Sequence, residues 1–319
     1  MIDLIGKKYY FFGLSILMIL AGVVGLLVNG VQLDIQFQGG TRIQIQMPDN
    51  DYDPNKAVEL VKNTIGKTAT VMKSQTYNAE NTNERLNLMV VDIASSETLD
   101  QTERTQVLDA IRKEFNVAEN ASVNVNSIAP FIGDEIKTKA LYAIFFASLI
   151  IIIYVWWRFK VMSGLSAGVM AVLALLHDVL LMCAVYFIFK IPLNESFVAA
   201  VLTVIGYSMN DTIIIYDRIR ENSNLLRKTP IAELVNRSVV QTLNRSINTV
   251  VTVLICIITL FIFASIHNVT SVKDFTLPLI VGIASGMYSS IFIASSLFVV
   301  WKESQAKKKV AAKAARSRA

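Results

Sequence analysis

Asp211 is the residue of this sequence whose surroundings point most directly to chemistry. It lies in the segment IGYSMNDTIIIYDRIREN, residues 205–222, inside an apolar run long enough to be a membrane-spanning helix. An aspartate in such a helix raises the free energy of membrane insertion by about 2.5–3.5 kcal/mol. Burial favours the protonated, neutral acid. A carboxyl group placed there can carry a proton across a membrane, or it can hold two helices together as a static ion pair.

Arg245 is the natural partner for this carboxylate. It begins a later apolar segment in the stretch TLNRSINTVVTVL. Its guanidinium group can reach inward toward Asp211, or it can extend to the lipid headgroups, as long basic side chains near helix ends do. The spacing of the two residues in the sequence leaves both orientations open.

A second polar pair, His177 and Asp178, lies midway along another apolar segment, LALLHDVLLM. Adjacent residues of a helix point about 100° apart, so these two side chains cannot both face one partner squarely. Asp178 is expected either to extend a proton path or to be capped by a nearby hydroxyl group. Ser208 and Asn210, which flank Asp211, are two further possible accessory residues.

Small residues recur where helices would have to pack closely. Gly282, Gly286 and Ser290 follow one another every four residues in the last apolar segment, and Gly206 lies near Asp211. Small residues at this spacing let a neighbouring helix approach closely. We predict that these four residues lie at contacts between helices.

A membrane-embedded helix bundle is needed to position all these side chains. The chain has 319 residues, and 53% of them are hydrophobic, which is high for a soluble domain. The two cysteines, Cys183 and Cys256, are expected to be packing residues, without a disulfide or a metal site. Six apolar blocks are long enough to cross about 30 Å of hydrocarbon as helices, at 9–29, 138–157, 161–189, 195–217, 246–265 and 275–301. The predicted fold class is a polytopic α-helical membrane protein with six transmembrane helices.

The distribution of Lys and Arg predicts the orientation in the membrane. Basic residues cluster at the N-terminus, after the second and fourth blocks and in the tail 302–319, whereas the alternate loops have few. Both termini are therefore expected in the cytoplasm. The segment 218–245 is predicted to be cytoplasmic and to contain an amphipathic helix lying on the membrane surface. Because the basic residues are not spread over a folded surface, the net charge of +5 does not predict binding to nucleic acid.

We predict that residues 30–137 form an extracytoplasmic α+β domain between the first two transmembrane helices. The stretch TRIQIQM alternates apolar and polar residues like a half-buried strand, and Asp53 with Pro54 is typical of a helix start. Strands at 41–47, 69–77, 85–93 and 121–128 and helices at 53–65 and 98–115 give the order βαββαβ, the ferredoxin-like pattern. The segment has no phosphate-binding loop and no Ser/His/Asp set. This favours a binding or mechanical module over an enzyme.

The segment at 205–222 closely resembles the fourth-span signature of the SecF family of protein-export membrane proteins. Four other stretches resemble further segments of that family in the same order along nearly the whole chain: FQGGT (37–41), LLHDV (175–179), TLNRSINT (242–249) and GIASGMYSSIFIA (282–294). Ser246 and Tyr216 depart from the pattern, in which threonine and phenylalanine are usual, but neither departure removes a charge.

This resemblance implies half of a twelve-helix transporter of the resistance-nodulation-division superfamily, in the bacterial cell (inner) membrane. A SecD-like subunit would supply the other half. The complex would act with the SecYEG channel on a translocating unfolded polypeptide, surrounded by membrane lipid. It would use a proton or sodium gradient and no other cofactor.

The functional aspartate and arginine of the family fall on Asp211 and Arg245. The resemblance therefore implies an inward-facing Arg245 and a proton relay between the two residues. Two alternatives stay open, namely a half-transporter that exports a lipid or drug, and a scaffold subunit that transports nothing.

Overall fold

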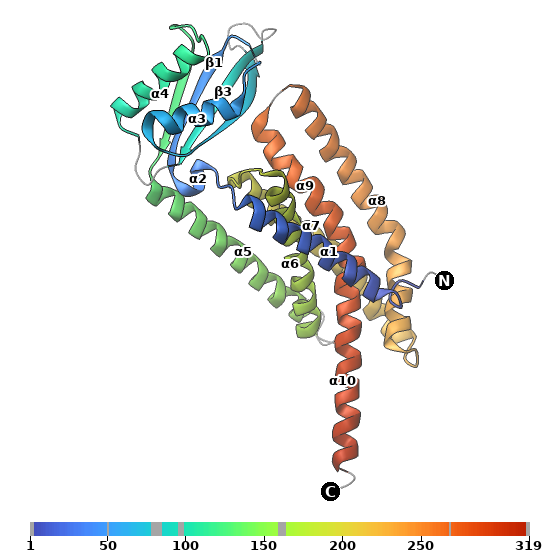
Figure 1. The fold of residues 1–319 in the computed structure, drawn as a ribbon. Coiled ribbons are helices and arrows are strands. Elements are labelled where there is room, and N and C mark those ends of the chain that lie inside the picture. Colours follow the sequence, from blue (N-terminus) through green and yellow to red (C-terminus); the bar gives the residue numbers. More distant parts are fainter. Residues whose placement is uncertain are drawn as a thin grey trace.

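The computed structural model has a bundle of long helices with a small α/β domain at one end (Figure 1). Both ends of the chain lie at the opposite end of the bundle. The structure describes residues 3–49, 51–77, 85–94, 99–158, 164–267 and 269–316. The start of the third predicted span at 161–163 and the last residues of the predicted basic tail, 317–319, lie outside the described residues.

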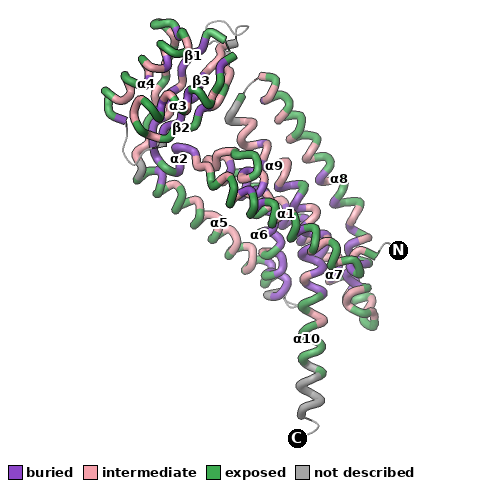
Figure 2. The backbone as a smooth tube through the Cα atoms, viewed as in Figure 1, coloured by how far each residue is buried: buried purple, intermediate pink, exposed green. Residues whose placement is uncertain are grey.

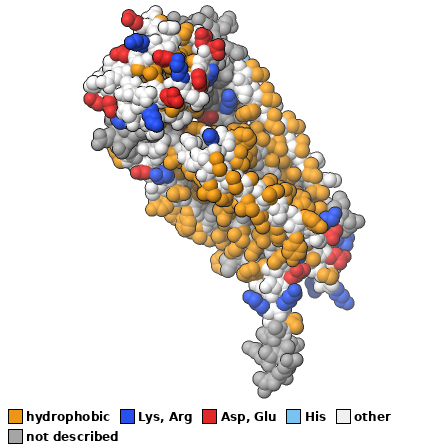
Figure 3. All heavy atoms as spheres, in the orientation of Figure 1, with side chains coloured by type: hydrophobic (Ala, Val, Ile, Leu, Met, Phe, Trp, Pro, Cys, Tyr) orange, Lys and Arg blue, Asp and Glu red, His pale blue; other side chains and the backbone are white. Residues whose placement is uncertain are grey.

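Within the described residues, six helical segments are long and apolar enough to cross a membrane, as the sequence predicts. Five are single helices: α1 (Lys8–Asn29), α5 (Pro130–Arg158), α6 (Gly164–Phe189), α7 (Glu195–Leu225) and α8 (Ile231–Ile266). The sixth consists of α9 (Thr270–Tyr288), the π-helical segment η2 (Ser289–Ala294) and α10 (Ser295–Arg316). Hydrophobic side chains form a belt around the bundle on the face shown in Figure 3, with charged side chains beyond both edges. The chain is a multi-pass membrane protein.

The prediction of a separate amphipathic helix within 218–245 is wrong. The first part of this segment continues α7 to Leu225, and the last part forms the beginning of α8. The apolar side chains of Leu234 and Val235 are buried in the bundle rather than at a lipid surface. Packing inside the bundle therefore covers the apolar face that the sequence alone assigned to lipid.

The α/β domain between α1 and α5 has the element order that the sequence predicts. Its elements are β1 (Gly40–Met47), α3 (Pro54–Ile65), β2 (Ala69–Tyr77), β3 (Arg85–Ala94), α4 (Gln101–Glu114) and β4 (Val123–Ile128). The strands form an antiparallel sheet in the order β2-β3-β1-β4. The domain ends earlier than predicted, because α5 begins at Pro130 rather than at residue 138.

Local sequence explains how this domain forms. The Asp53 side chain accepts a hydrogen bond from the backbone N–H of Asn55 at 2.9 Å, and Pro54 is the first residue of α3, as predicted. Helices α3 and α4 lie on one face of the sheet (Figure 1). Ile43 and Ile45, two positions apart on β1, are fully buried in the core that this arrangement creates.

A neck, residues 30–39, joins α1 to the α/β domain and contains the short helix α2 (Ile35–Gln38). Leu193, which lies just before α7, donates a backbone hydrogen bond to Gln32 and accepts one from Asp34, both at 2.9 Å. The neck is thus attached to the connection between α6 and α7. It also touches α5, since a Cβ atom on Gly133 would lie only 2.9 Å from the carbonyl carbon of Phe37.

Arg42 on β1 clamps the neck to the sheet through two carboxylates. Its Nη2 atom donates to Asp34 Oδ2 at 2.6 Å, and its Nε and Nη2 atoms donate to the two oxygens of Asp92 on β3, both at 2.6 Å. Burial raises the pKa of the Asp92 carboxyl, and the hydrogen bond and charge of Arg42 oppose this effect. The clamp therefore depends on the positive charge of one arginine.

Replacing Arg42 by glutamine tests the clamp. The change leaves two largely buried carboxylates without their positive partner, and breaking a buried ion pair costs about 3–5 kcal/mol. Because the Arg42 side chain is 23% exposed, we expect a smaller loss of roughly 2–3 kcal/mol in the unfolding free energy of the α/β domain. Hydrogen exchange of the β1 and β3 amides in the purified protein measures this loss of unfolding free energy.

The loss of stability in Arg42→Gln should depend on pH in a predictable direction. The folded-state pKa of Asp92 is raised above its ordinary value, so Asp92 binds a proton more tightly in the folded domain than in the unfolded chain. Without Arg42 the interactions that lower this pKa are lost, so the pKa rises further in the variant than in the wild type. Acidification should therefore stabilise the folded variant more than the wild type and shrink the deficit of Arg42→Gln. Lys56→Gln, which breaks the exposed pair of Lys56 with Glu114, is the control and should change little. Wild-type exchange rates in Arg42→Gln would contradict the clamp.

Several glycines make close contacts between helices of the bundle. A Cβ atom on Gly22 of α1 would lie 2.3 Å from Ala184 Cβ of α6. On α9, a Cβ atom on Gly282 would lie 2.4 Å from Val204 Cγ2, and one on Gly286 would lie 2.9 Å from Ser208 Cβ. Gly282 and Gly286 therefore lie at helix contacts, as predicted. Gly206 contacts no other helix among the described residues, because it lies on the exposed face of α7, where none of them comes within 4 Å of the Cβ position.

Alanine substitutions at Gly282 and Gly206 should distinguish the effect of close packing on stability from the effect of helix propensity. Gly282→Ala forces the branched Val204 side chain away, and overpacking of this kind costs about 1–3 kcal/mol. Gly206→Ala meets open space and should stabilise the helix by up to about 1 kcal/mol. Thermal unfolding of the purified single chain in detergent measures both. Equal stability of the two variants would contradict the packing described here.

Candidate functional site

Asp211 lies on α7 with 1% of its surface exposed. Among the residues that the structure describes, neither of its carboxylate oxygens has a hydrogen-bond partner. The hydroxyl group of Tyr207, one helical turn earlier, is also buried without a partner among these residues. A buried carboxylate without a donor is costly when ionised. This chain by itself therefore stabilises the charged form of Asp211 poorly.

The register of α7 against α8 places Arg245 about one helical turn from the level of Asp211. Asn222 Nδ2 of α7 donates to Ser238 Oγ of α8 at 2.8 Å, and Arg218 Nε donates to Gln241 Oε1 at 2.7 Å. Continuing this antiparallel register by two turns of each helix brings Asp211 opposite residues 248–249, one turn beyond Arg245. Arg245 is therefore near enough for its charge to act on Asp211.

Arg245 does not have the inward orientation that the resemblance implied. Its side chain is exposed in this single chain, and no ion pair joins it to Asp211 within the described part of the structure. The physical reason lies in α8, which is exposed along much of its length (Figure 2), and Arg245 is one of its exposed residues.

Polar side chains continue along this uncovered face, which we call the polar face. It includes Thr203, Gly206 and Asn210 on α7 and Asn244, Arg245, Asn248 and Thr252 on α8, all of them exposed in the chain. Polar and charged side chains in a membrane span are unfavourable against lipid and usually face protein or water. The polar face therefore predicts a protein partner beside α7 and α8. Asn210 belongs to this face and not to the surroundings of Asp178.

Asp178 is capped by hydroxyl groups, which is one of the two outcomes that its sequence position left open. It is fully buried on α6. Ser285 donates to its Oδ1 atom at 2.6 Å, and Ser208 and Ser289 donate to its Oδ2 atom, both at 2.8 Å. His177 Nδ1 lies 3.3 Å from Oδ1. Ser208, predicted as an accessory of Asp211, therefore binds Asp178 instead.

Sequence reasoning missed part of this hydrogen-bonded cluster. Ser285 and Ser289 lie within GIASGMYSSIFIA, but no role was predicted for either of them. Ser290, predicted to be a packing residue, also forms hydrogen bonds: it lies 2.8 Å from Thr212 Oγ1 and donates to the backbone carbonyl of Ser208 at 3.1 Å. The repeated serines, spaced to face one side of a helix, were the signal that could have predicted these contacts.

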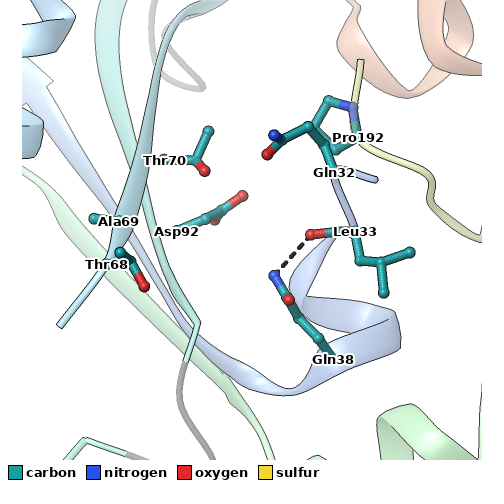
Figure 4. Close-up of a pocket in the computed structure, with 8 residues that line it drawn as sticks. All are labelled: Gln32, Leu33, Gln38, Thr68, Ala69, Thr70, Asp92 and Pro192. Carbon is teal, nitrogen blue, oxygen red and sulfur yellow. Dashed lines mark hydrogen bonds between the residues drawn. The ribbon is translucent and has the colours of Figure 1, made fainter. Parts of the chain in front are cut away.

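Other features of the chain offer no comparable chemistry. The described residues contain no group of three His, Cys, Asp or Glu side chains that could hold a metal ion. Both cysteines are free thiols, and Cys256 is exposed rather than packed inside. A cavity of about 180 Å³ lies between the neck and the sheet, away from α7 and α8 (Figure 4). Its lining residues are Gln32, Leu33, Gln38, Thr68, Ala69, Thr70, Asp92 and Pro192.

Comparison with known sequences finds similar proteins along almost the whole chain. Residues 107–304 match the family described as "Protein export membrane protein SecD/SecF, C-terminal". The protein translocase subunit SecF of Anaerolinea thermophila is 33% identical over 311 residues, covering 96% of both chains. That of Alicyclobacillus acidocaldarius is 35% identical over 309 residues, covering 96% of this chain and 94% of the relative.

In some longer relatives, only one part of the protein is similar to this chain. The protein translocase subunit SecDF of Bacillus subtilis is 33% identical over 309 residues, which are 96% of this chain and 39% of the relative. The crystal structure of SecDF from Thermus thermophilus, described as a translocon-associated membrane protein, aligns with a TM-score of 0.76 at 29% identity. The alignment covers 95% of this chain and 39% of that one. The chain therefore belongs to the SecD/SecF family of protein-export membrane proteins, and within that family to the SecF subunits that it matches over nearly their full length.

Proposed function

We propose that this chain is the SecF subunit of a protein-export complex and that Asp211 couples a proton gradient to export. The membership of the family supports the role in export. The observation that carries the coupling is the buried, unpartnered carboxylate of Asp211 beside the uncovered face that bears Arg245. Sodium is the alternative coupling ion, and the chain itself is not an enzyme in this proposal.

A SecD-like half covers the polar face in this proposal. The fused SecDF relatives, of which this chain spans only 39%, support such a partner. A second bundle against α7 and α8 would remove Arg245 from lipid and turn its guanidinium group toward Asp211. The site is then complete only in the assembled complex. The further partners are the SecYEG channel and an unfolded polypeptide that is being exported.

The chemistry of the relay follows from the two charge states of one carboxyl group. Without a proton, Asp211 is an anion that attracts Arg245, and with a proton it loses this attraction. A proton that crosses 100 mV provides about 2.3 kcal/mol. That free energy is enough to change the balance between two arrangements of α7 and α8 by more than tenfold.

A movement of α7 at Asp211 could be transmitted to the outer domain through a few direct contacts. Helix α7 begins directly after the connection that holds Leu193, and Leu193 shares two backbone hydrogen bonds with the neck. The neck in turn is joined to the sheet by Arg42. A shift of the start of α7 would therefore move the α/β domain, which we take to be a ferredoxin-like module outside the cell membrane. Both termini are cytoplasmic in this arrangement, as the loop charges suggest.

Asp211→Asn tests the coupling directly. The amide keeps the shape of the side chain but cannot ionise. In vesicles containing the assembled complex and the SecYEG channel, we expect the gradient-driven part of export to fall to the level without a gradient, while ATP-driven initiation continues. Asp211→Glu, which keeps a carboxyl group, should retain part of the stimulation, and the exposed Asp109→Asn on α4 should behave like the wild type. Normal gradient dependence in a fully assembled Asp211→Asn complex would rule the relay out.

Gly206→Leu tests whether the polar face is the site of assembly. Nothing of this chain lies within 4 Å of the added Cβ, so the single chain should keep its thermal stability. A bulky side chain in a close helix interface prevents packing, and we expect co-purification with the SecD-like subunit to fall by roughly fivefold or more. Gly13→Leu on α1, where the Cβ position is also open, is the matched control. Full assembly of Gly206→Leu would place the partner elsewhere.

A further inference from the structure

The carboxylate of Asp178 connects three helical segments to its own helix. Its hydrogen bonds come from Ser208 on α7, Ser285 on α9 and Ser289 on η2, at 2.6–2.8 Å. No Lys or Arg of the described residues forms an ion pair with it. We call these four residues the aspartate–serine hub. Close packing alone would require small side chains there, but it would not require a buried carboxylate.

The π-helical segment η2 lets adjacent serines hold two different helices. Ser289 donates to Asp178 on α6 at 2.8 Å, whereas Ser290 contacts Thr212 Oγ1 on α7 at 2.8 Å. Adjacent residues of a helix point in clearly different directions, so one pair of serines can bind both neighbours. π-Helical turns are rare and occur frequently at functional sites. The segment therefore ties α6 and α7 together at the level of Asp211.

Asp211 lies between the two attachment points of α7. Ser208 and Thr212, three residues before and one residue after it, both form hydrogen bonds to the seam of α6 and η2. With about 100° per residue, Asp211 points roughly 60° away from Ser208 on the side opposite to Thr212. Thr203, Gly206 and Asn210 of the polar face point about a further 80–140° round the helix in the same sense, so Asp211 lies between the hub and the polar face. The rotation of α7 about its axis, which these two bonds fix, determines how closely Asp211 approaches that face and Arg245.

We propose that Asp178 is a positioning residue, which acts through Ser208 to hold α7 at the rotation that presents Asp211 for proton exchange. The inference rests on the proposed function and adds to it the element that orients the relay. Rotation of α7 away from the hub would change the distance between Asp211 and Arg245. The hub is therefore the part of the chain that sets the surroundings in which Asp211 gains and loses its proton.

Other titratable groups near Asp211 must stay unchanged in a test. They are Tyr207 on its own helix, Arg245 on α8, Asp178 and His177 on α6, and Tyr288 on α9, which stacks on His177. Serine substitutions alter none of these groups. Ser208→Ala removes the hub's bond to α7, and Ser285→Ala removes an equally buried hydroxyl that binds the same carboxylate from α9.

The experiment is the pH dependence of carbodiimide labelling of Asp211 in the assembled complex, read by mass spectrometry of its peptide. Dicyclohexylcarbodiimide reacts with protonated carboxyl groups in apolar surroundings, so the midpoint of labelling reports the protonation of Asp211. We expect Ser208→Ala to shift this midpoint by about half a pH unit or more, and Ser285→Ala to shift it by less than half as much. Thr212→Val, which removes the other bond of α7, should resemble Ser208→Ala.

Assembly and thermal stability are measured on the same samples. Equal shifts in Ser208→Ala and Ser285→Ala, or no shift in Ser208→Ala and Thr212→Val while both assemble, would overturn the proposal. Because labelling is independent of export, the outcome is separate from the export test of Asp211→Asn. A shifted midpoint with normal gradient-driven export would support the hub and contradict the relay.

Discussion

The structure depends on one constraint: a carboxylate in the middle of a membrane must have donors, a positive partner or a proton. Asp178 meets this constraint with three serine hydroxyl groups from its own chain. Asp211 has no hydrogen-bond donor among the described residues. The two aspartates lie in neighbouring helices of the same bundle and differ mainly in what surrounds them. One is suited to hold helices in place, and the other is suited to change its charge.

The arrangement around these aspartates divides the bundle into a fixed and an open side. On the fixed side, glycines such as Gly22 and Gly282 bring helices into close contact, and the aspartate–serine hub joins α6, α7, α9 and η2. On the open side, the polar face of α7 and α8 is exposed, with none of the described residues covering it. The neck and Arg42 extend the fixed side to the α/β domain. A change at the open side can therefore be passed through α7 to the outer domain.

Much of this organisation could be predicted from the sequence, because it follows from local patterns. Six apolar blocks predicted the helices, and Asp53 with Pro54 predicted the start of α3. Patterns that depend on tertiary contacts were less informative. The apolar residues Leu234 and Val235 fit a lipid surface as well as a helix contact, and only the packed structure shows that they are buried inside the bundle. Ser208 was predicted to assist Asp211, and Ser285 and Ser289 were given no role, since sequence alone does not show that Asp178 lies beside them. Arg245 could not be oriented from one chain, because in the proposed complex the surface it would face belongs to a partner.

The central claim is that Asp211 carries protons during export, and proton movement can be observed directly. The assembled complex would be reconstituted with the SecYEG channel in vesicles that contain a pH-sensitive dye, under an imposed proton gradient. The account predicts that protons cross the membrane faster while a polypeptide is being exported, and that Asp211→Asn abolishes this increase without affecting assembly. An equal, export-linked proton flux in the wild type and in Asp211→Asn would contradict it.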